Sequence, residues 1–128
     1  MPVQLPYMSI CTGRQTYQIN WQLIGSDVNC QTKNVVYCIT CSKCKEQYIG
    51  ETEKTLALRT NQHRGYIRNN KVDKATGEHF NKPGHQLADM KISIVEKVKS
   101  NDPMMLEVRE SHFIKKFQTK YKGMNRKI

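Results

Sequence analysis

The sequence lacks any apolar run long enough to cross a membrane, and it contains no internal repeat and no low-complexity segment. Because a transmembrane helix needs about 20 consecutive apolar residues, we expect no membrane partner. The N-terminus has neither the charged start nor the continuous apolar centre of a signal peptide, which makes an intracellular location the expectation. With 128 residues, the chain has the length of one domain with a hydrophobic core of ordinary size.

Acidic residues are also scarce, because 11 Asp and Glu oppose 21 Lys and Arg and leave a net charge of +10. A small domain this basic is most simply explained by a polyanionic partner, and nucleic acid comes first. A solvated surface whose charge favours solubility is the alternative. The basic residues concentrate in residues 54–74 and in the C-terminal tail. The candidates for contact with nucleic acid are Lys54, Arg64, Arg68, Lys115, Lys116 and Lys122.

The pattern after the first 33 residues predicts a hairpin followed by a helix. The β-branched run 34–40 and the short run 47–50 predict two antiparallel strands joined by a polar turn. The helix that follows has Thr52 as its expected N-cap. One face of this helix carries Leu56, Thr60, His63 and Ile67.

The second half of the chain predicts one more strand and one more helix. Residues 77–85 contain a Pro-Gly turn and read as a loop. Residues 90–98 alternate and predict a third strand. Asp102 and Pro103 are typical of the N-cap and first residue of a helix, which Gly123 would end.

The order strand, strand, helix, strand, helix predicts a small α/β domain of the α+β type. We expect a central three-stranded antiparallel sheet flanked by helices. The domain would occupy residues 34–128, and residues 1–33 would form an N-terminal extension that could contain a hairpin.

Polar side chains occur where the two predicted helices should face a core. Glu110 interrupts the apolar stripe of the second helix, and a buried carboxylate is costly unless it is paired or binds a cation. Arg59 and His63 lie four residues apart on the first helix. Tyr37 and Tyr48 can meet across the hairpin, where an aromatic pair alone would stabilise the sheet. Each residue has an ordinary structural explanation, but together they would suit a phosphodiester, which needs a cation, a metal and a base.

These residues resemble the GIY-YIG nuclease domain. The resemblance rests on Tyr37, on the run Tyr48-Ile49-Gly50, on Arg59 with His63, on Glu110 and on Gly123-Met124-Asn125. The first motif departs from the family name, because it reads Val35-Val36-Tyr37 and has no glycine. The closer resemblance is to the endonuclease domain of Penelope-like retroelements, which place cysteines between the two tyrosine motifs and an H-x5-H pair downstream.

The resemblance implies a role for each catalytic candidate. Tyr37 would be the general base that activates water, with help from Tyr48. Arg59 would stabilise the phosphate, and His63 would assist proton transfer or orient a phosphate. Glu110 would be the sole protein ligand of one divalent cation, Mg²⁺ or Mn²⁺, which keeps several waters. Asn125 would support the site by hydrogen bonding.

A second cluster has the residue types of a structural metal site. Cys41 and Cys44 form a knuckle at the hairpin turn, which is a familiar half of a tetrahedral zinc site. His79 and His85, around the Pro-Gly turn, would supply the other half. Four such ligands close the coordination sphere, so the Zn²⁺ would be structural. The alternative is two free thiols and two solvated imidazoles.

The other cysteines are less informative. Cys38 neighbours Tyr37 and should point to the opposite face of its strand; we interpret it as a small buried residue, although it could replace one zinc ligand. Cys11 and Cys30 are isolated in the sequence. They could form a bridge, bind a second metal or be simply buried, and we favour burial.

The resemblance implies a metal-dependent DNA endonuclease that nicks DNA and leaves a 3′-hydroxyl, which would prime reverse transcription. The partners would be DNA and a reverse transcriptase fused to the domain or working with it, and the location would be nuclear. A catalytically inactive, zinc-stabilised nucleic-acid-binding module is the alternative, and an interaction domain of a larger polyprotein is a third reading.

Overall fold

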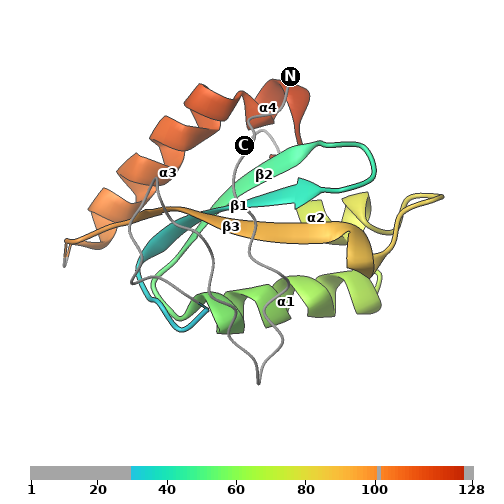
Figure 1. Cartoon of the computed structure of the whole chain (residues 1–128), viewed down its shortest axis with the longest axis horizontal. Coiled ribbons are helices and arrows are strands. Elements are labelled where there is room, and N and C mark those ends of the chain that lie inside the picture. Colours follow the sequence, from blue (N-terminus) through green and yellow to red (C-terminus); the bar gives the residue numbers. More distant parts are fainter. Residues whose placement is uncertain (1–29, 101, 126–128) are drawn as a thin grey trace.

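The computed structural model describes residues 30–100 and 102–125, which form one sheet covered by helices on both faces (Figure 1). Helix α3 covers one face of the sheet, and α1 covers the other (Figure 1). This is the α+β architecture with a three-stranded antiparallel sheet that the sequence predicts. The elements are β1 Val35–Cys41, β2 Gln47–Thr52, α1 Leu56–Arg68, α2 Ala75–His79, the 3-10 turn η1 Leu87–Asp89, β3 Met90–Lys97, α3 Pro103–Phe117 and α4 Thr119–Lys122.

The sheet has the strand order β2-β1-β3, so β1 is central and β2 is an edge strand. Every residue of β1 is buried, because α1 packs below it and α3 above it. In the β1–β2 register, Tyr37 lies opposite Gly50, and Ile39 lies opposite Tyr48. The register between β1 and β3 shifts by one residue between Val36 and Tyr37. The three predicted strands are therefore confirmed.

The start of the first helix differs from the prediction. Strand β2 continues to Thr52, and α1 begins only at Leu56. Its N-cap is Thr55, whose side-chain oxygen accepts a hydrogen bond from the backbone N–H of Leu58 at 3.2 Å. Thr52 instead accepts from the backbone N–H of Lys54 in the turn before the helix. Both threonines have suitable cap chemistry. Thr52 is still paired with β1 as the last residue of β2, so the helix begins after Thr55 instead.

Helix α2 is a second departure, because residues 77–85 were predicted to be a loop. Its N-cap residue makes no side-chain cap hydrogen bond. A helix of five residues is not stable in isolation, and burial of Thr76, Gly77 and His79 stabilises it instead. Tertiary packing therefore forms an element for which the local sequence gives little signal.

The last helix begins where the sequence predicts and then breaks once. Asp102 caps α3 by accepting from the backbone N–H of Met104 at 3.0 Å, and Pro103 is the first helical residue. Gln118 adopts a left-handed conformation with φ of 58°, which ends α3 and separates it from α4. This break turns the chain back toward β2, which α4 contacts.

Two apolar clusters hold the layers together. The cluster on the α1 side includes Tyr37, Ile39, Leu56 and Phe80. The cluster on the α3 side joins residues of the sheet such as Ile49 to Leu106 and Phe113. Burial of large apolar side chains contributes about 1.5–3 kcal/mol each, so both faces of the sheet contribute to stability.

The described part of the chain contains no helix that is long and apolar enough to cross a membrane. The hairpin considered for residues 1–33 falls mostly on residues outside the described ranges. Cys11 also lies outside them. Cys30 is fully buried, as favoured, but it is also disulfide-bonded, so the structure shows the bridge considered among the alternatives rather than burial alone.

Candidate active site and metal-binding cluster

Two phenols lie next to each other on the α1 side of the sheet. Tyr37 of β1 is fully buried and Tyr48 of β2 is partly buried, with their ring centroids 6.3 Å apart. A Cβ atom added at Gly50 would lie 2.5 Å from the Cζ and Oη atoms of Tyr37. Only glycine leaves room at this position for the phenol. The expectation that the two tyrosines meet across the hairpin agrees with this geometry.

A chain of hydrogen bonds passes through the hydroxyl of Tyr37. Arg59 Nε donates to Tyr37 Oη at 3.0 Å, and Tyr37 Oη lies 2.7 Å from His63 Nε2. His63 Nδ1 lies 2.8 Å from Thr76 Oγ1. Because a guanidinium can only donate, Tyr37 Oη accepts from Arg59 and directs its own hydrogen toward His63. We therefore assign His63 as the neutral tautomer with its hydrogen on Nδ1, donated to Thr76.

Burial keeps the phenol and the imidazole uncharged. Burial, followed by the neighbouring Tyr48, raises the pKa of Tyr37 well above its ordinary value, although Arg59 acts in the opposite direction. Burial, followed by Arg59, lowers the pKa of His63 to about 3. At neutral pH Tyr37 is therefore a hydroxyl that donates, and His63 is a neutral acceptor.

Helix α3, on the other side of the sheet, carries a carboxylate that acts electrostatically on the phenols. Glu110 is partly buried, and burial, followed by Glu51 and Glu107, raises its pKa to about 7 against the effect of Arg59. The charge of Glu110 also raises the pKa of both phenols, so the acid lies within electrostatic reach of them. The described residues show no direct ion pair between Glu110 and Arg59. Crowded carboxylates beside one guanidinium suit a hard divalent cation and a phosphate between them.

Asn125 positions the strand that carries the second phenol. Its Oδ1 accepts from the backbone N–H of Ile49 at 2.7 Å, and its Nδ2 donates to the Ile49 carbonyl at 2.9 Å. Both hydrogen-bonding groups of an edge-strand residue are thereby satisfied by one amide. Because Ile49 lies between Tyr48 and Gly50, these two hydrogen bonds hold the backbone that carries both residues.

Four side chains at the far end of the hairpin could hold a metal ion. The ligand atoms of Cys41, Cys44, His79 and His85 all lie within 4.8 Å of one another. Cys44 Sγ and His79 Nε2 are 3.4 Å apart. The Nε2 atom of His85 is buried and has no hydrogen-bond partner among the described residues, while its Nδ1 lies 3.3 Å from the Pro83 carbonyl. An orphaned imidazole nitrogen beside two thiols fits a tetrahedral site with nitrogen and sulfur ligands.

The outer nitrogen of His79 completes this arrangement. His79 Nδ1 lies 3.8 Å from Glu46 Oε1, and metal-binding histidines commonly face a carboxylate in this way. Cys38, considered as an extra ligand, is absent from the cluster. It is buried on the opposite face of β1 with Val36 and Ile49, because successive side chains of a strand alternate between faces.

Five of the six predicted nucleic-acid contacts are exposed, and Arg64 is not. Its side chain is 6% exposed, and its Nη1 donates to Asn61 Oδ1. Arg64 belongs to the inward stripe of α1 together with Thr60 and Ile67. The prediction of a direct contact is therefore wrong for this residue. The exposed five are Lys54, Arg68, Lys115, Lys116 and Lys122.

The sequence-based reasoning missed Thr76 and Glu51. Thr76 is 1% exposed and accepts the hydrogen bond that fixes His63, but it lies on the helix that was not predicted. Glu51 could have been found, because it follows Gly50 on β2 and alternation places it on the α3 face with Ile49.

This fold and site define a nuclease domain, which hydrolyses phosphodiesters. The family model described as "GIY-YIG catalytic domain" matches residues 33–125, and the chain therefore belongs to this family. The expected resemblance to GIY-YIG nucleases is confirmed, as is the fold. The chain is thus a nuclease domain of the metal-dependent DNA endonuclease class.

Among solved structures, the chain is similar to the "Structure of the Catalytic Domain of Homing Endonuclease I-TevI", with a TM-score of 0.62 and 21% sequence identity. The match covers 75% of this chain and 100% of that one. At this identity the likeness concerns the fold. No curated protein compared with the chain matches it significantly.

Proposed function

We propose that this domain nicks DNA and leaves a 3′-hydroxyl that primes reverse transcription. The convergence of Tyr37, Arg59 and Glu110 from three separate elements carries the proposal. Arg59 donates to the hydroxyl of Tyr37, and the charge of Glu110 acts on both phenols. In this proposal they supply a hydroxyl, a fixed positive charge and a carboxylate that would bind a metal ion. These are the groups that phosphodiester hydrolysis requires.

The side chains of the site have distinct tasks in this proposal. In its ionised form, Tyr37 would take a proton from the attacking water and return to the neutral phenol. Burial disfavours the phenolate, and Arg59, which lowers the pKa of Tyr37 against that effect, would stabilise it together with the divalent cation. His63 Nε2, 2.7 Å from Tyr37 Oη, would hold the phenol oxygen in position. Arg59 binds a phosphate oxygen and keeps its hydrogen bond to Tyr37. A divalent cation, Mg²⁺ or Mn²⁺, held by Glu110 would stabilise charge on the phosphate and the leaving oxygen.

Supercoiled plasmid tests the proposal directly. In the presence of Mg²⁺ or Mn²⁺, we expect the protein to convert supercoiled plasmid to the open-circular form, and the nick to be extended by a DNA polymerase without prior phosphatase treatment. Nicked product that needs phosphatase before extension would refute the 3′-hydroxyl. Salt-sensitive DNA binding without any nicking would instead support the inactive binding module.

The retroelement context is part of this proposal. The Cys and His pairs that carry the resemblance to Penelope-like elements come together in one cluster, which supports a domain of that type working with a reverse transcriptase. A nuclear location goes with cutting chromosomal DNA, and imaging of a fluorescent fusion in cells would test it.

We propose that the Cys41, Cys44, His79 and His85 cluster binds one structural Zn²⁺. The ligand types, the spacing within 4.8 Å and the orphaned His85 nitrogen support this assignment. All four positions of a tetrahedral ion would be filled by protein, which leaves none for a reacting water.

Thr76 provides a prediction about the imidazole. Thr76→Val keeps the volume of the side chain but removes the oxygen that accepts from His63 Nδ1. We expect kcat to fall about tenfold, because an imidazole without its orienting partner loses the productive tautomer. Thr76→Ser keeps the hydroxyl and should retain most activity. ¹⁵N NMR of the histidine nitrogens measures the tautomer, and an unchanged Nδ1–H signal in Thr76→Val would contradict the assignment.

The pH dependence follows from Glu110. Its pKa of about 7 lies above the ordinary 4.5, so the folded protein holds this proton more tightly than the unfolded chain does. In the metal-free protein, the contribution of Glu110 to stability is therefore greatest below 4.5 and is lost as the pH rises through about 7. Cation binding has the opposite dependence, because it needs the ionised carboxylate.

We therefore expect the cleavage rate at subsaturating Mg²⁺ to rise as the pH passes through about 7. Glu107→Gln should move this rise to lower pH, because it removes a negative charge that raises the pKa of Glu110. His63, with a pKa of about 3, cannot produce it. A pH-rate profile at several Mg²⁺ concentrations measures the effect, and an identical rise in Glu107→Gln would contradict the electrostatic origin.

A further inference from the structure

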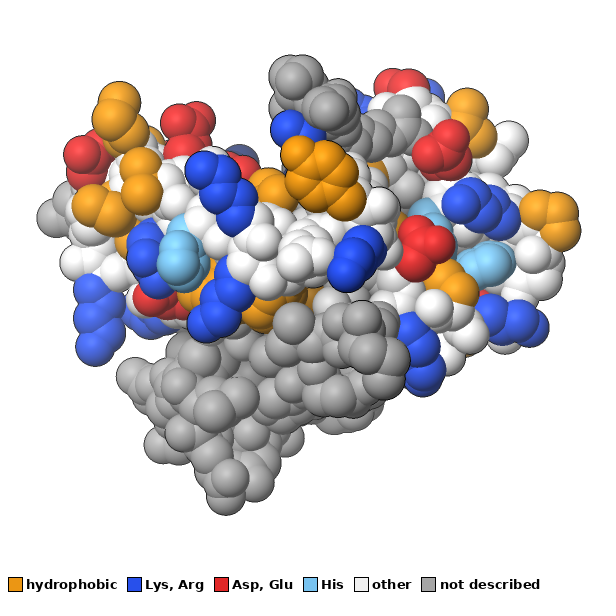
Figure 2. All heavy atoms as spheres, turned by 90° about the horizontal axis from the view of Figure 1, so that it is seen from above, with side chains coloured by type: hydrophobic (Ala, Val, Ile, Leu, Met, Phe, Trp, Pro, Cys, Tyr) orange, Lys and Arg blue, Asp and Glu red, His pale blue; other side chains and the backbone are white. Residues whose placement is uncertain are grey.

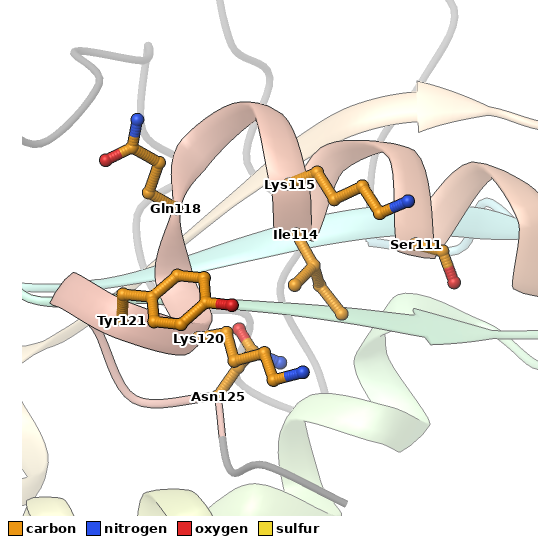
Figure 3. Close-up of a pocket in the computed structure, with 7 residues that line it drawn as sticks. All are labelled: Ser111, Ile114, Lys115, Gln118, Lys120, Tyr121 and Asn125. Carbon is orange, nitrogen blue, oxygen red and sulfur yellow. The ribbon is translucent and has the colours of Figure 1, made fainter.

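The junction of α3 and α4 contains a cavity that the catalytic roles above leave unexplained. Its volume is about 620 Å³, within the ordinary range for ligand pockets. Figure 3 shows its described lining residues, which come from both helices and from the segment after α4. These residues are Ser111, Ile114, Lys115, Gln118, Lys120, Tyr121 and Asn125.

This cavity shares one residue, Asn125, with the support of the active site. Asn125 lines it and also binds the backbone of Ile49, which lies next to Tyr48. Ser111 lines it and directly follows Glu110 on α3. These two links are the reason that we relate the cavity to the DNA next to the scissile phosphate.

The chemistry of the lining suits one kind of occupant. Lys115 and Lys120 are exposed, and the described lining contains no acidic residue. Tyr121 is 78% exposed, and its ring lies at the edge of the cavity, with the hydroxyl toward Ile114 (Figure 3). Seen from the α3 side, Lys and Arg side chains are spread across this face, interspersed with Asp and Glu side chains (Figure 2). An exposed aromatic ring between lysines binds nucleic acid by stacking and by charge.

The base in such a site has to be outside the duplex. In double-stranded DNA both faces of a base are covered by its neighbours, so a tyrosine ring can stack only on an unpaired or extruded base. We propose that the cavity binds an unpaired DNA nucleotide next to the scissile phosphate, with its base on Tyr121 and its phosphates on Lys115 and Lys120. This inference rests on the proposed nuclease function and adds a preference for DNA with unpaired nucleotides at the cut.

Fluorescence anisotropy with a labelled single-stranded dT oligonucleotide tests the site. The Glu110→Gln background prevents cleavage in the presence of Mg²⁺. In this background, Tyr121→Ala should weaken binding by about 5- to 100-fold, which corresponds to the loss of one stacked base. Tyr121→Phe keeps the ring and should recover most of the lost affinity.

Salt dependence separates stacking from charge. Lys120→Ala should reduce the slope of log K against log salt by about 0.7, as expected for one phosphate contact to a single strand. Tyr121→Ala should leave that slope unchanged. Lys97→Ala, a matched exposed lysine on β3, should alter neither affinity nor slope beyond the effect of a general loss of charge.

Several outcomes would overturn the site. If Tyr121→Ala and its parent bind the oligonucleotide equally, the stacking contact is contradicted. If intact duplex competes as well as the single strand, the site does not require an unpaired base. Because these measurements use a cleavage-deficient protein, they do not depend on nicking. An absence of plasmid nicking with intact Tyr121-dependent binding would refute the nuclease proposal and leave the nucleotide site standing.

Discussion

Replacement of Glu110 by glutamine is expected to reduce plasmid nicking by on the order of a thousandfold. The neutral amide keeps the shape of the side chain but loses the charge that would hold Mg²⁺ or Mn²⁺. The charge stabilisation provided by a catalytic cation is worth several kcal/mol, and about 4 kcal/mol corresponds to a factor of a thousand in rate. The measurement is the initial rate of open-circular product at saturating metal and neutral pH.

Binding of DNA should survive this substitution. Glu110→Gln removes one negative charge from a site that faces a phosphate, so affinity should be equal or higher. The folded protein should also be at least as stable above pH 7, because the raised pKa of Glu110 means that its ionised form is penalised in the folded state. A loss of activity with normal binding and normal unfolding would therefore be a loss of chemistry.

Glu107→Gln is the matched control. Glu107 lies one turn earlier on α3 and is exposed, so at high pH and saturating metal its amide variant should cleave within a few-fold of the parent. If Glu110→Gln nicks at a rate within tenfold of the parent, Glu110 is not the essential metal ligand. If both variants are equally impaired, the two carboxylates share the cation.

The sequence predicts the sheet well, because β1, β2 and β3 carry strong β-branched and alternating patterns. It also predicts the start of α3, where Asp102 and Pro103 give a local signal that no long-range contact has to decide. It fails at the start of α1, where two threonines compete for the cap, and at α2, which depends on burial. A strand or helix start can be predicted when one segment carries the whole signal. Where two residues suit the same cap, or where a helix forms only by burial, the outcome depends on the strand or helix that packs against the segment.

The same distinction holds for the candidate site. Strand alternation and helix periodicity predict that Tyr37, Arg59 and Glu110 face one site. Tyr37 and Arg59 are hydrogen-bonded, and the charge of Glu110 acts on the phenols. Thr76 could not be found, because its role depends on how α2 packs against α1. The burial of Arg64 could have been found, since it shares the inward stripe of α1 with Ile67, but charge alone suggested a surface role.

Loss of the metal from the cysteine and histidine cluster is expected to produce the largest effect on stability. We expect about one zinc per chain in the purified protein, and Cys44→Ser should abolish it. A metal present at about 1,000 times its Kd stabilises the folded state by about 4 kcal/mol. For a domain of this size, that corresponds to a fall in Tm of roughly 15 °C or more.

Cys44 is the informative position for this substitution. Its side chain is exposed, so replacement by serine opens no cavity in the core, and a fall in Tm reports the loss of metal. Cys38→Ala is the control, because Cys38 is buried on the opposite face of β1. This variant should keep its zinc while losing some packing energy. Retention of zinc by Cys44→Ser, or an unchanged Tm after its loss, would contradict a structural site.

Removal of the metal should also lower nicking activity, because α2 carries one residue of the metal cluster and one residue that supports the active site. His79 belongs to the metal cluster, and Thr76, three residues earlier, holds the imidazole of His63. Gly77 between them packs so closely against the backbone of Lys71 that a Cβ atom would overlap it. A displaced α2 therefore cannot keep Thr76 in place. We expect Cys44→Ser, assayed with saturating Mg²⁺ below its Tm, to lose about as much nicking activity as Thr76→Val; full activity would show that packing against α1 alone holds the helix.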